Sequence, residues 1–186
     1  VTGSVLSGKA KLGDSLIAVP GEEIVKIRGL ESHGAKADTV YAGQRAAINL
    51  TGIELGSIKR GMNLSDPACG QVDTSWDAWM TWQKTVPSGT RIRLHLGTGE
   101  YIGRIYRYKD WPEQYWRLQL EEPLGAGAGD RGIVRLYSPP QLLGGVMLTI
   151  AGAKGKKLSE ERLILAQALA DGNVNEIVYA IIAGQG

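Results

Sequence analysis

The sequence TRIRLHL at residues 90–96 alternates between polar and aliphatic side chains. In an extended chain the isoleucine and the two leucines share one face, and the arginines and the histidine share the other. This pattern predicts a β-strand with one buried face. Two further stretches alternate in a similar way, EIVKIRGL at 23–30 and RAAINL at 45–50.

Glycine- and proline-containing turn signals separate these stretches at intervals of about 8–12 residues, a spacing that favours an antiparallel barrel over βαβ units. No amphipathic helix of useful length fits residues 1–64. We therefore predict a mainly β chain with two antiparallel β-barrels, the first at residues 1–66 and the second at 67–143.

The pattern becomes helical after residue 143. Ser159 is a favourable N-cap, and acidic residues follow it in the first turn. Asn173 starts a second capping pattern with Glu176 three residues later, and aliphatic residues recur behind it at helical spacing. We expect residues 144–186 to form a linker and the truncated start of a third, helical domain.

The composition is that of a globular protein, with 43% hydrophobic and 22% charged residues. Its 21 Lys and Arg against 19 Asp and Glu leave a net charge of +2, unlike a domain that binds nucleic acid mainly through charge. No stretch reaches the roughly 18 apolar residues of a membrane span. We expect a cytoplasmic location, and, from the start inside a strand without methionine, a fragment of a longer protein.

Sequence signals for catalysis or nucleotide binding are missing. The phosphate-loop pattern GxxxxGK[ST] and the pattern GxGxxG do not occur in a fitting context. Cys69, His33 and His95 give no indication of a catalytic pair, and they are too few for an ordinary zinc site. The glycine-rich run at 125–129 is expected to be a hairpin connection. We therefore expect no enzymatic activity and no metal or nucleotide cofactor for this chain by itself.

Aromatic residues gather between residues 76 and 116, where arginines alternate with aliphatic residues. Trp76, Trp79 and Trp82 have a spacing that fits either a helix or an irregular aromatic cluster. Such rings are able to stack on unpaired bases, but burial in a core is the commoner role of aromatics on strands. The arginines near them are expected on solvent-facing positions: Arg91, Arg93, Arg104 and Arg107.

Several short motifs together carry a resemblance to a known family. They are VTGSVLSG at 1–8, KLGD at 11–14, AGQR at 42–45, IKRG at 58–61 and RLYSPP at 135–140. The chain resembles the second and third domains of translational GTPases of the elongation factor Tu type. The AGQR loop makes it most similar to the selenocysteine-specific elongation factors, the SelB family, in which winged helices follow the barrels.

The resemblance implies a GTP-dependent factor that delivers selenocysteyl-tRNA to the ribosome at recoded UGA codons. GTP and Mg would bind an upstream domain, and downstream winged helices would bind the selenoprotein mRNA hairpin. Arg45 would belong to a positively charged pocket for the aminoacyl end, with Gln44, Glu31 and His33 near it. From the residues alone, Arg45 also fits a charged rim position, and a double-barrel protein-interaction or scaffold module without an RNA role is the alternative.

Overall fold

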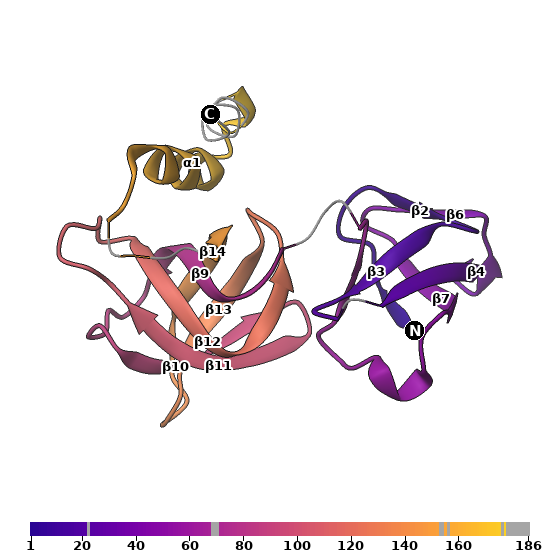
Figure 1. Cartoon of the computed structure of the whole chain (residues 1–186), viewed down its shortest axis with the longest axis horizontal. Coiled ribbons are helices and arrows are strands. Elements are labelled where there is room, and N and C mark those ends of the chain that lie inside the picture. Colours follow the sequence, from indigo (N-terminus) through magenta and orange to yellow (C-terminus); the bar gives the residue numbers. More distant parts are fainter. Residues whose placement is uncertain (22, 68–70, 153–154, 156, 176, 178–186) are drawn as a thin grey trace. The chain divides into compact units, whose positions relative to one another are not determined.

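A computed structural model describes residues 1–21, 23–67, 71–152, 155, 157–175 and 177 (Figure 1). The chain divides into two compact units, Val1–Gly70 and Gln71–Gly186. Both consist mainly of antiparallel strands, and the described part contains one α-helix near its end. The predicted mainly β fold class is therefore confirmed. No helix among the described residues is long and apolar enough to cross a membrane.

The first unit is built on one curved sheet and one small ribbon. The sheet has the order β1-β7-β4-β3-β8, with β5 paired to β4, and the ribbon pairs β2 with β6. A short 3₁₀-helix, η1 (Leu55–Ser57), precedes the last strand. The strands are β1 (Thr2–Ser4), β2 (Lys9–Lys11), β3 (Ser15–Val19), β4 (Ile24–Ser32), β5 (Ala35–Lys36), β6 (Thr39–Tyr41), β7 (Arg45–Thr51) and β8 (Asn63–Ser65).

A β-bulge in β4 sets the core of the first unit. Ile27 pairs with Leu50 and Gly29 pairs with Asn49, so Arg28 is an extra residue between two neighbouring pairs. The bulge turns Leu30 inward beside Ile27, and both are buried. Strict alternation predicts Leu30 on the opposite face from Ile27, so the sequence pattern fails at this point.

The second unit contains a closed barrel with the strand order β10-β11-β12-β9-β14-β13. Because β12 and β13 are not neighbours in this barrel, the glycine-rich run at 125–129 joins non-adjacent strands, and the predicted hairpin is wrong. The Asp130 carboxylate accepts a hydrogen bond from the Gly127 N–H at 2.8 Å and shapes this connection. The strands are β9 (Gln71–Trp82), β10 (Thr90–Leu96), β11 (Gly99–Tyr106), β12 (Tyr115–Ala126), β13 (Arg131–Leu136) and β14 (Leu142–Ala151).

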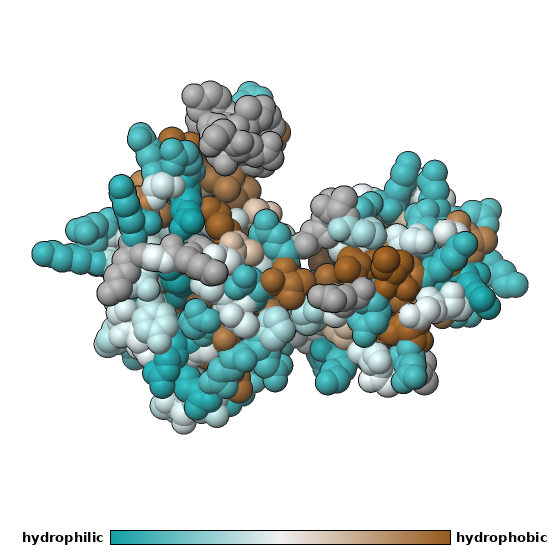
Figure 2. Space-filling model, in the orientation of Figure 1, coloured by the Kyte–Doolittle hydropathy of each residue, from teal (hydrophilic) through white to brown (hydrophobic). Residues whose placement is uncertain are grey.

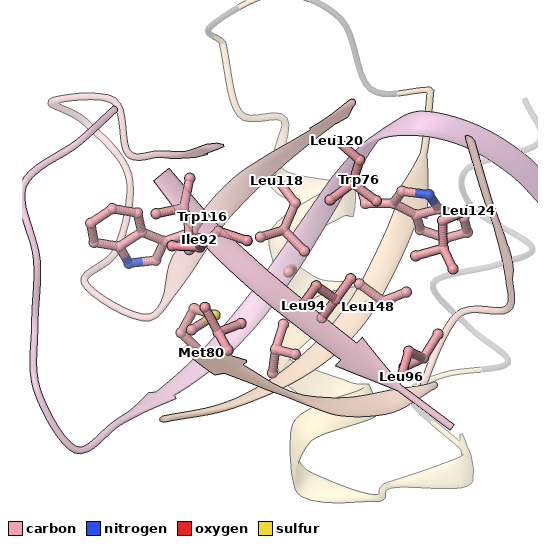
Figure 3. Close-up of a cluster of buried hydrophobic side chains, with 14 of the residues drawn as sticks. Trp76, Met80, Ile92, Leu94, Leu96, Trp116, Leu118, Leu120, Leu124 and Leu148 are labelled. Atoms are coloured by element: carbon pink, nitrogen blue, oxygen red, sulfur yellow. The ribbon is translucent and has the colours of Figure 1, made fainter. Parts of the chain in front are cut away.

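The barrel interior holds the larger hydrophobic core (Figure 3). The three aliphatic residues of β10 are all buried in it, which confirms the alternation predicted for residues 90–96. Met80, Leu118 and Leu148 enter from strands β9, β12 and β14, across the barrel from β10. The inward faces of the strands therefore form the core, and the outward faces can contact α1, solvent or a binding partner.

The tryptophan group does not form a helix, because residues 76–82 lie in β9. Trp76 is fully buried, and its indole N–H donates to the carbonyl of Asp73 at 3.0 Å. Trp82 packs edge-on against Trp116 with ring centroids 4.9 Å apart. These rings therefore belong largely to the core, as the commoner role of aromatics predicts.

The second barrel extends beyond its predicted end at residue 143, because β14 runs from Leu142 to Ala151 and pairs with both β9 and β13. The helix α1 (Glu160–Asp171) follows, with Ser159 as N-cap as predicted and Gly172 in the left-handed conformation at its end. The second predicted helix, after Asn173, lies mostly outside the described residues.

Candidate nucleic-acid interface

The AGQR motif forms a tight turn between β6 and β7. The Gln44 N–H donates to the carbonyl of Tyr41 at 3.1 Å, and Gly43 has a φ of 86°, which requires a residue without a Cβ penalty. In return, the Gln44 side-chain oxygen accepts from the Tyr41 N–H at 2.8 Å. Gln44 therefore stabilises the turn, and its side-chain oxygen is already occupied by the backbone N–H of Tyr41.

Arg45 is the first residue of β7 and points away from the core. Its neighbour Ala46 is buried, so alternation places the Arg45 side chain on the outer face, where it is exposed. Ser4 of β1 lies directly opposite. Among the described residues, no hydrogen bond or ion pair engages the guanidinium, whereas the carbonyl of Arg45 accepts from the Ser32 hydroxyl at 3.0 Å. The Arg45 backbone is therefore held by a hydrogen bond, while its guanidinium has no partner among the described residues.

Glu31 and His33 lie at the end of β4, beside the start of β7. Glu31 pairs with Ala47 on one side and with Lys36 on the other, so its side chain is on the same outer face as that of Arg45, one diagonal step away. His33 occupies the two-residue tip of the β4–β5 hairpin. Its φ of 52°, followed by 78° at Gly34, fits a type I′ turn. The four predicted site residues therefore gather at one end of the sheet.

Two exposed apolar residues beside Arg45 were missed by the sequence analysis. Leu6 is 75% exposed and Tyr41 is 56% exposed. They are close because the carbonyls of Val5 and Gly8 accept hydrogen bonds from the turn residues Gly43 and Ala42, both at 2.9 Å. The signal in the sequence is weak, since the aromatic residue directly before AGQR is also a natural strand residue. The structure adds an apolar surface to the charged rim.

The second unit carries a separate basic face on the outside of its barrel. Arg91 and Arg93 lie over the ring of Tyr137, with guanidinium carbons 4.1 and 4.7 Å from its centroid. Arg91 is directly opposite Arg104 of β11, and Arg93 is directly opposite Arg135 of β13. Like charges directly opposite each other destabilise a sheet, so this arrangement is unfavourable for folding alone.

Two glutamates offset only part of this charge. Arg91 pairs with Glu121 at 2.8 Å, and Arg93 pairs with Glu100. The Arg135 guanidinium has no partner among the described residues. Arg107 lies beyond the end of β11 and does not belong to this face; it is half-buried, so its expected solvent-facing position is only partly met. The visible surface of the second unit away from α1 is mostly hydrophilic (Figure 2).

The described residues contain no group of three or more His, Cys, Asp or Glu side chains that could hold a metal ion. Cys69 lies outside them. His95, half-buried on β10, is 3.8 Å from Glu100 and far along the chain from His33. The side chains present can bind anions, apolar groups and hydrogen-bond donors or acceptors.

Comparison with known families identifies the first unit. The family model described as elongation factor Tu domain 2 matches residues 1–65. Residues 1–65 form an elongation factor Tu domain 2-like region. The AGQR turn and the rim around Arg45 lie within the matched residues.

Relatives extend the similarity beyond domain 2. The chain is 32% identical, over its whole length, to a selenocysteine-specific elongation factor of Desulfomicrobium baculatum, and it spans 31% of that protein. It is 26% identical to the Escherichia coli protein of the same name, over 86% of the chain and 26% of that protein. The chain is thus a homologue of selenocysteine-specific elongation factors and spans about a third of their length or less.

Solved structures share the fold. A bacterial selenocysteine-specific elongation factor EF-Sec superposes with a TM-score of 0.76 at 20% identity, over 96% of this chain and 30% of that one. The apo elongation factor SelB of Methanococcus maripaludis gives a TM-score of 0.69 at 19% identity, over 81% of this chain and 39% of that one. Both units of the chain therefore have counterparts of the same fold in known structures.

Proposed function

We propose that this chain is the aminoacyl-tRNA-binding part of a selenocysteine-specific translation elongation factor. Its homologues carry that name, and the first unit is an elongation factor Tu domain 2-like region. The single observation that carries the proposal is the exposed, unpartnered guanidinium of Arg45, which follows a hydrogen-bonded turn.

Arg45 is proposed to bind the selenolate of selenocysteyl-tRNA. The selenol is ionised at neutral pH, while the hydroxyl of serine is neutral. A guanidinium stays protonated at any working pH and is weakly hydrated, so it suits an anion at a partly desolvated site. A charge-assisted contact is worth about 1.5–3 kcal/mol and a neutral one about 0.5–1.5 kcal/mol, and this difference is the basis of discrimination.

The neighbouring residues are proposed to hold the end of the tRNA. Glu31 and His33 offer polar groups at the end of β4, while Gln44 keeps the turn in shape. Leu6 and Tyr41 offer the apolar surface on which a base stacks, an interaction worth about 1–3 kcal/mol in proteins that bind single strands.

The basic face of the second unit is proposed to bind the phosphate backbone of the same tRNA. Bound phosphates offset the repulsion between Arg93 and Arg135 that folding alone leaves uncompensated. Contacts of this kind position an RNA without reading its sequence, and they make binding salt-dependent.

In the whole protein we assign GTP and Mg²⁺ to a GTPase domain outside this chain. We propose that this protein is a cytoplasmic GTPase that delivers selenocysteyl-tRNA to the ribosome at recoded UGA codons. A winged-helix region after residue 186 would bind the selenoprotein mRNA hairpin. The role of residues 1–186 is binding rather than catalysis.

The alternative, a double-barrel protein-interaction module, predicts an exposed apolar patch around the tryptophans of β9. Trp76 is fully buried, and Trp79 and Trp82 are each partly buried against other aromatic or aliphatic residues. The patch that this alternative needs is not available, which favours the tRNA proposal.

Filter binding by the full-length protein with GTP tests the proposal. Selenocysteyl-tRNA should bind at least tenfold more tightly than the same tRNA charged with serine. Equal affinity for the two would contradict selenocysteine recognition, and no binding of either would contradict the tRNA role altogether.

A further inference from the structure

We propose that α1 is a fixed part of the second barrel, clamped by the buried carboxylate of Asp77. The helix, up to its C-cap Gly172, is then held rigidly on the barrel instead of being tethered flexibly through the segment between β14 and α1. This inference does not depend on the proposed tRNA role.

The clamp begins with an ion pair buried between strands. Asp77 of β9 is fully buried, and Arg117 of β12 donates to it from Nε at 2.7 Å and from Nη2 at 3.3 Å. The Tyr115 hydroxyl also donates to this carboxylate, at 3.1 Å. A buried carboxylate is tolerated only when it is paired and hydrogen-bonded in this way.

The same carboxylate reaches α1. Arg162, in the first turn of α1, places Nη1 3.8 Å from Asp77. Arg117 in turn donates from Nη1 to the carbonyl of Gly155 at 2.5 Å, so it also holds the segment that leads to α1. Two arginines from different elements therefore meet at one buried anion, and each ties part of the C-terminal segment to the barrel.

Aromatic side chains pack around the ion pair of Asp77 and Arg117. Trp111 and Tyr115 are buried with ring centroids 5.0 Å apart, and the guanidinium of Arg117 lies 5.1 Å from the Trp111 ring. Ala166 of α1 is fully buried in this cluster, with Leu158 packed against it. A small residue at position 166 lets the helix approach the rings closely, so a larger or charged side chain there would push α1 away.

The helix has little reason to form alone. An isolated helix as short as the 12 residues of α1 is marginal in water even with favourable residues. Any protection of the α1 amides from exchange must therefore come mainly from docking of the helix on the barrel. Hydrogen exchange is thus a direct measure of how firmly α1 is held.

Hydrogen–deuterium exchange of the full-length protein tests the inference. In the unmodified protein, amides of α1 should be protected. Ala166→Glu should speed their exchange at least tenfold while β9–β14 stay protected. Gln167→Glu is the matched control, because it places the same charge one residue further along the helix at an exposed position, and it should leave exchange unchanged.

Arg162→Gln removes only the α1 contribution to the ionic group and should also speed exchange in α1, with Arg117 still paired to Asp77. If Ala166→Glu also speeds exchange in the barrel strands, the exchange rate of α1 in Arg162→Gln decides whether the inference holds. Unprotected α1 amides in the unmodified protein, or protection unchanged in both variants, would overturn the inference.

Discussion

The hydroxyl of Ser32 donates a hydrogen bond to the carbonyl oxygen of Arg45 at 3.0 Å, and this bond joins the end of β4 to the start of β7. The contact fixes the backbone of Arg45 without using its side chain. Glu31 and His33 flank the donor, so one hydrogen bond connects the two halves of the candidate site.

Ser32→Ala should therefore affect the site more than the fold. Loss of one exposed hydrogen bond is expected to lower the free energy of unfolding by about 0.5–1.5 kcal/mol at most. Selenocysteyl-tRNA affinity should fall as the β4 end loosens. Chemical denaturation and filter binding measure the two effects, and Ser32→Thr, which keeps the hydroxyl, should restore both. An unchanged affinity in Ser32→Ala would show that the bond does not support the site.

Arg135→Ala should separate binding from stability in the second unit. The change removes a charge directly opposite Arg93, so the free energy of unfolding should stay within about 0.5 kcal/mol or rise. The dependence of tRNA affinity on salt should weaken by roughly 0.7–0.9 in the logarithmic slope, the value for one lost phosphate contact. Lys84→Ala, an exposed cation bonded to Gln141, is the control. An unchanged slope in Arg135→Ala would remove this residue from the RNA interface.

Much of the fold is visible in the sequence, because alternation over residues 90–96 reports burial on one face of a strand. The inward turn of Leu30 is not visible, since it depends on a bulge that only pairing with β7 defines. The pairing of arginines across strands cannot be read from the sequence either. Arg93 and Arg135 are far apart in the chain, and only the strand register places them opposite each other. In the candidate site, Arg45 was found through the AGQR motif, whereas Leu6 was missed because its exposure depends on the path of a loop.

Gly103→Ala should destabilise the second barrel. A Cβ at Gly103 would lie 2.3 Å from the carbonyl oxygen of Gln119 and 2.8 Å from the Cα of Leu120, and backbone atoms yield poorly. Overpacking of this kind costs roughly 1–3 kcal/mol. Gly3→Ala is the matched control, because nothing lies within 4 Å of its added Cβ. Urea denaturation compares the two, and equal midpoints would mean that β11 and β12 adjust freely.

Tyr115→Phe should change the alkaline stability of the second unit. Burial, and then the carboxylate of Asp77, raise the pKa of Tyr115 above its usual value of 10.0. The folded state therefore favours the neutral phenol, while the unfolded chain ionises it from about pH 10. This stabilising contribution is complete below about pH 10 and declines as the pH rises further.

Chemical denaturation at about pH 8 and about pH 11 measures how much stability each protein loses as the pH rises. The unmodified protein should lose more stability over this interval than Tyr115→Phe, and Tyr41→Phe, at an exposed position, should behave like the unmodified protein. Equal losses in the unmodified protein and Tyr115→Phe would contradict a buried phenol at Asp77.

The most direct test of selenocysteine recognition is the effect of Arg45→Ala on two aminoacyl-tRNAs in the full-length protein. Selenocysteyl-tRNA affinity should fall about tenfold to a hundredfold, which corresponds to roughly 1.5–3 kcal/mol for a lost charge-assisted contact. Seryl-tRNA affinity should change far less. Arg45→Lys should recover only part of the loss, and Arg28→Ala, an exposed arginine of the same domain, should affect neither tRNA selectively. Equal losses for both aminoacyl-tRNAs in Arg45→Ala would make Arg45 a general tRNA contact and would contradict its proposed role in selecting selenocysteine.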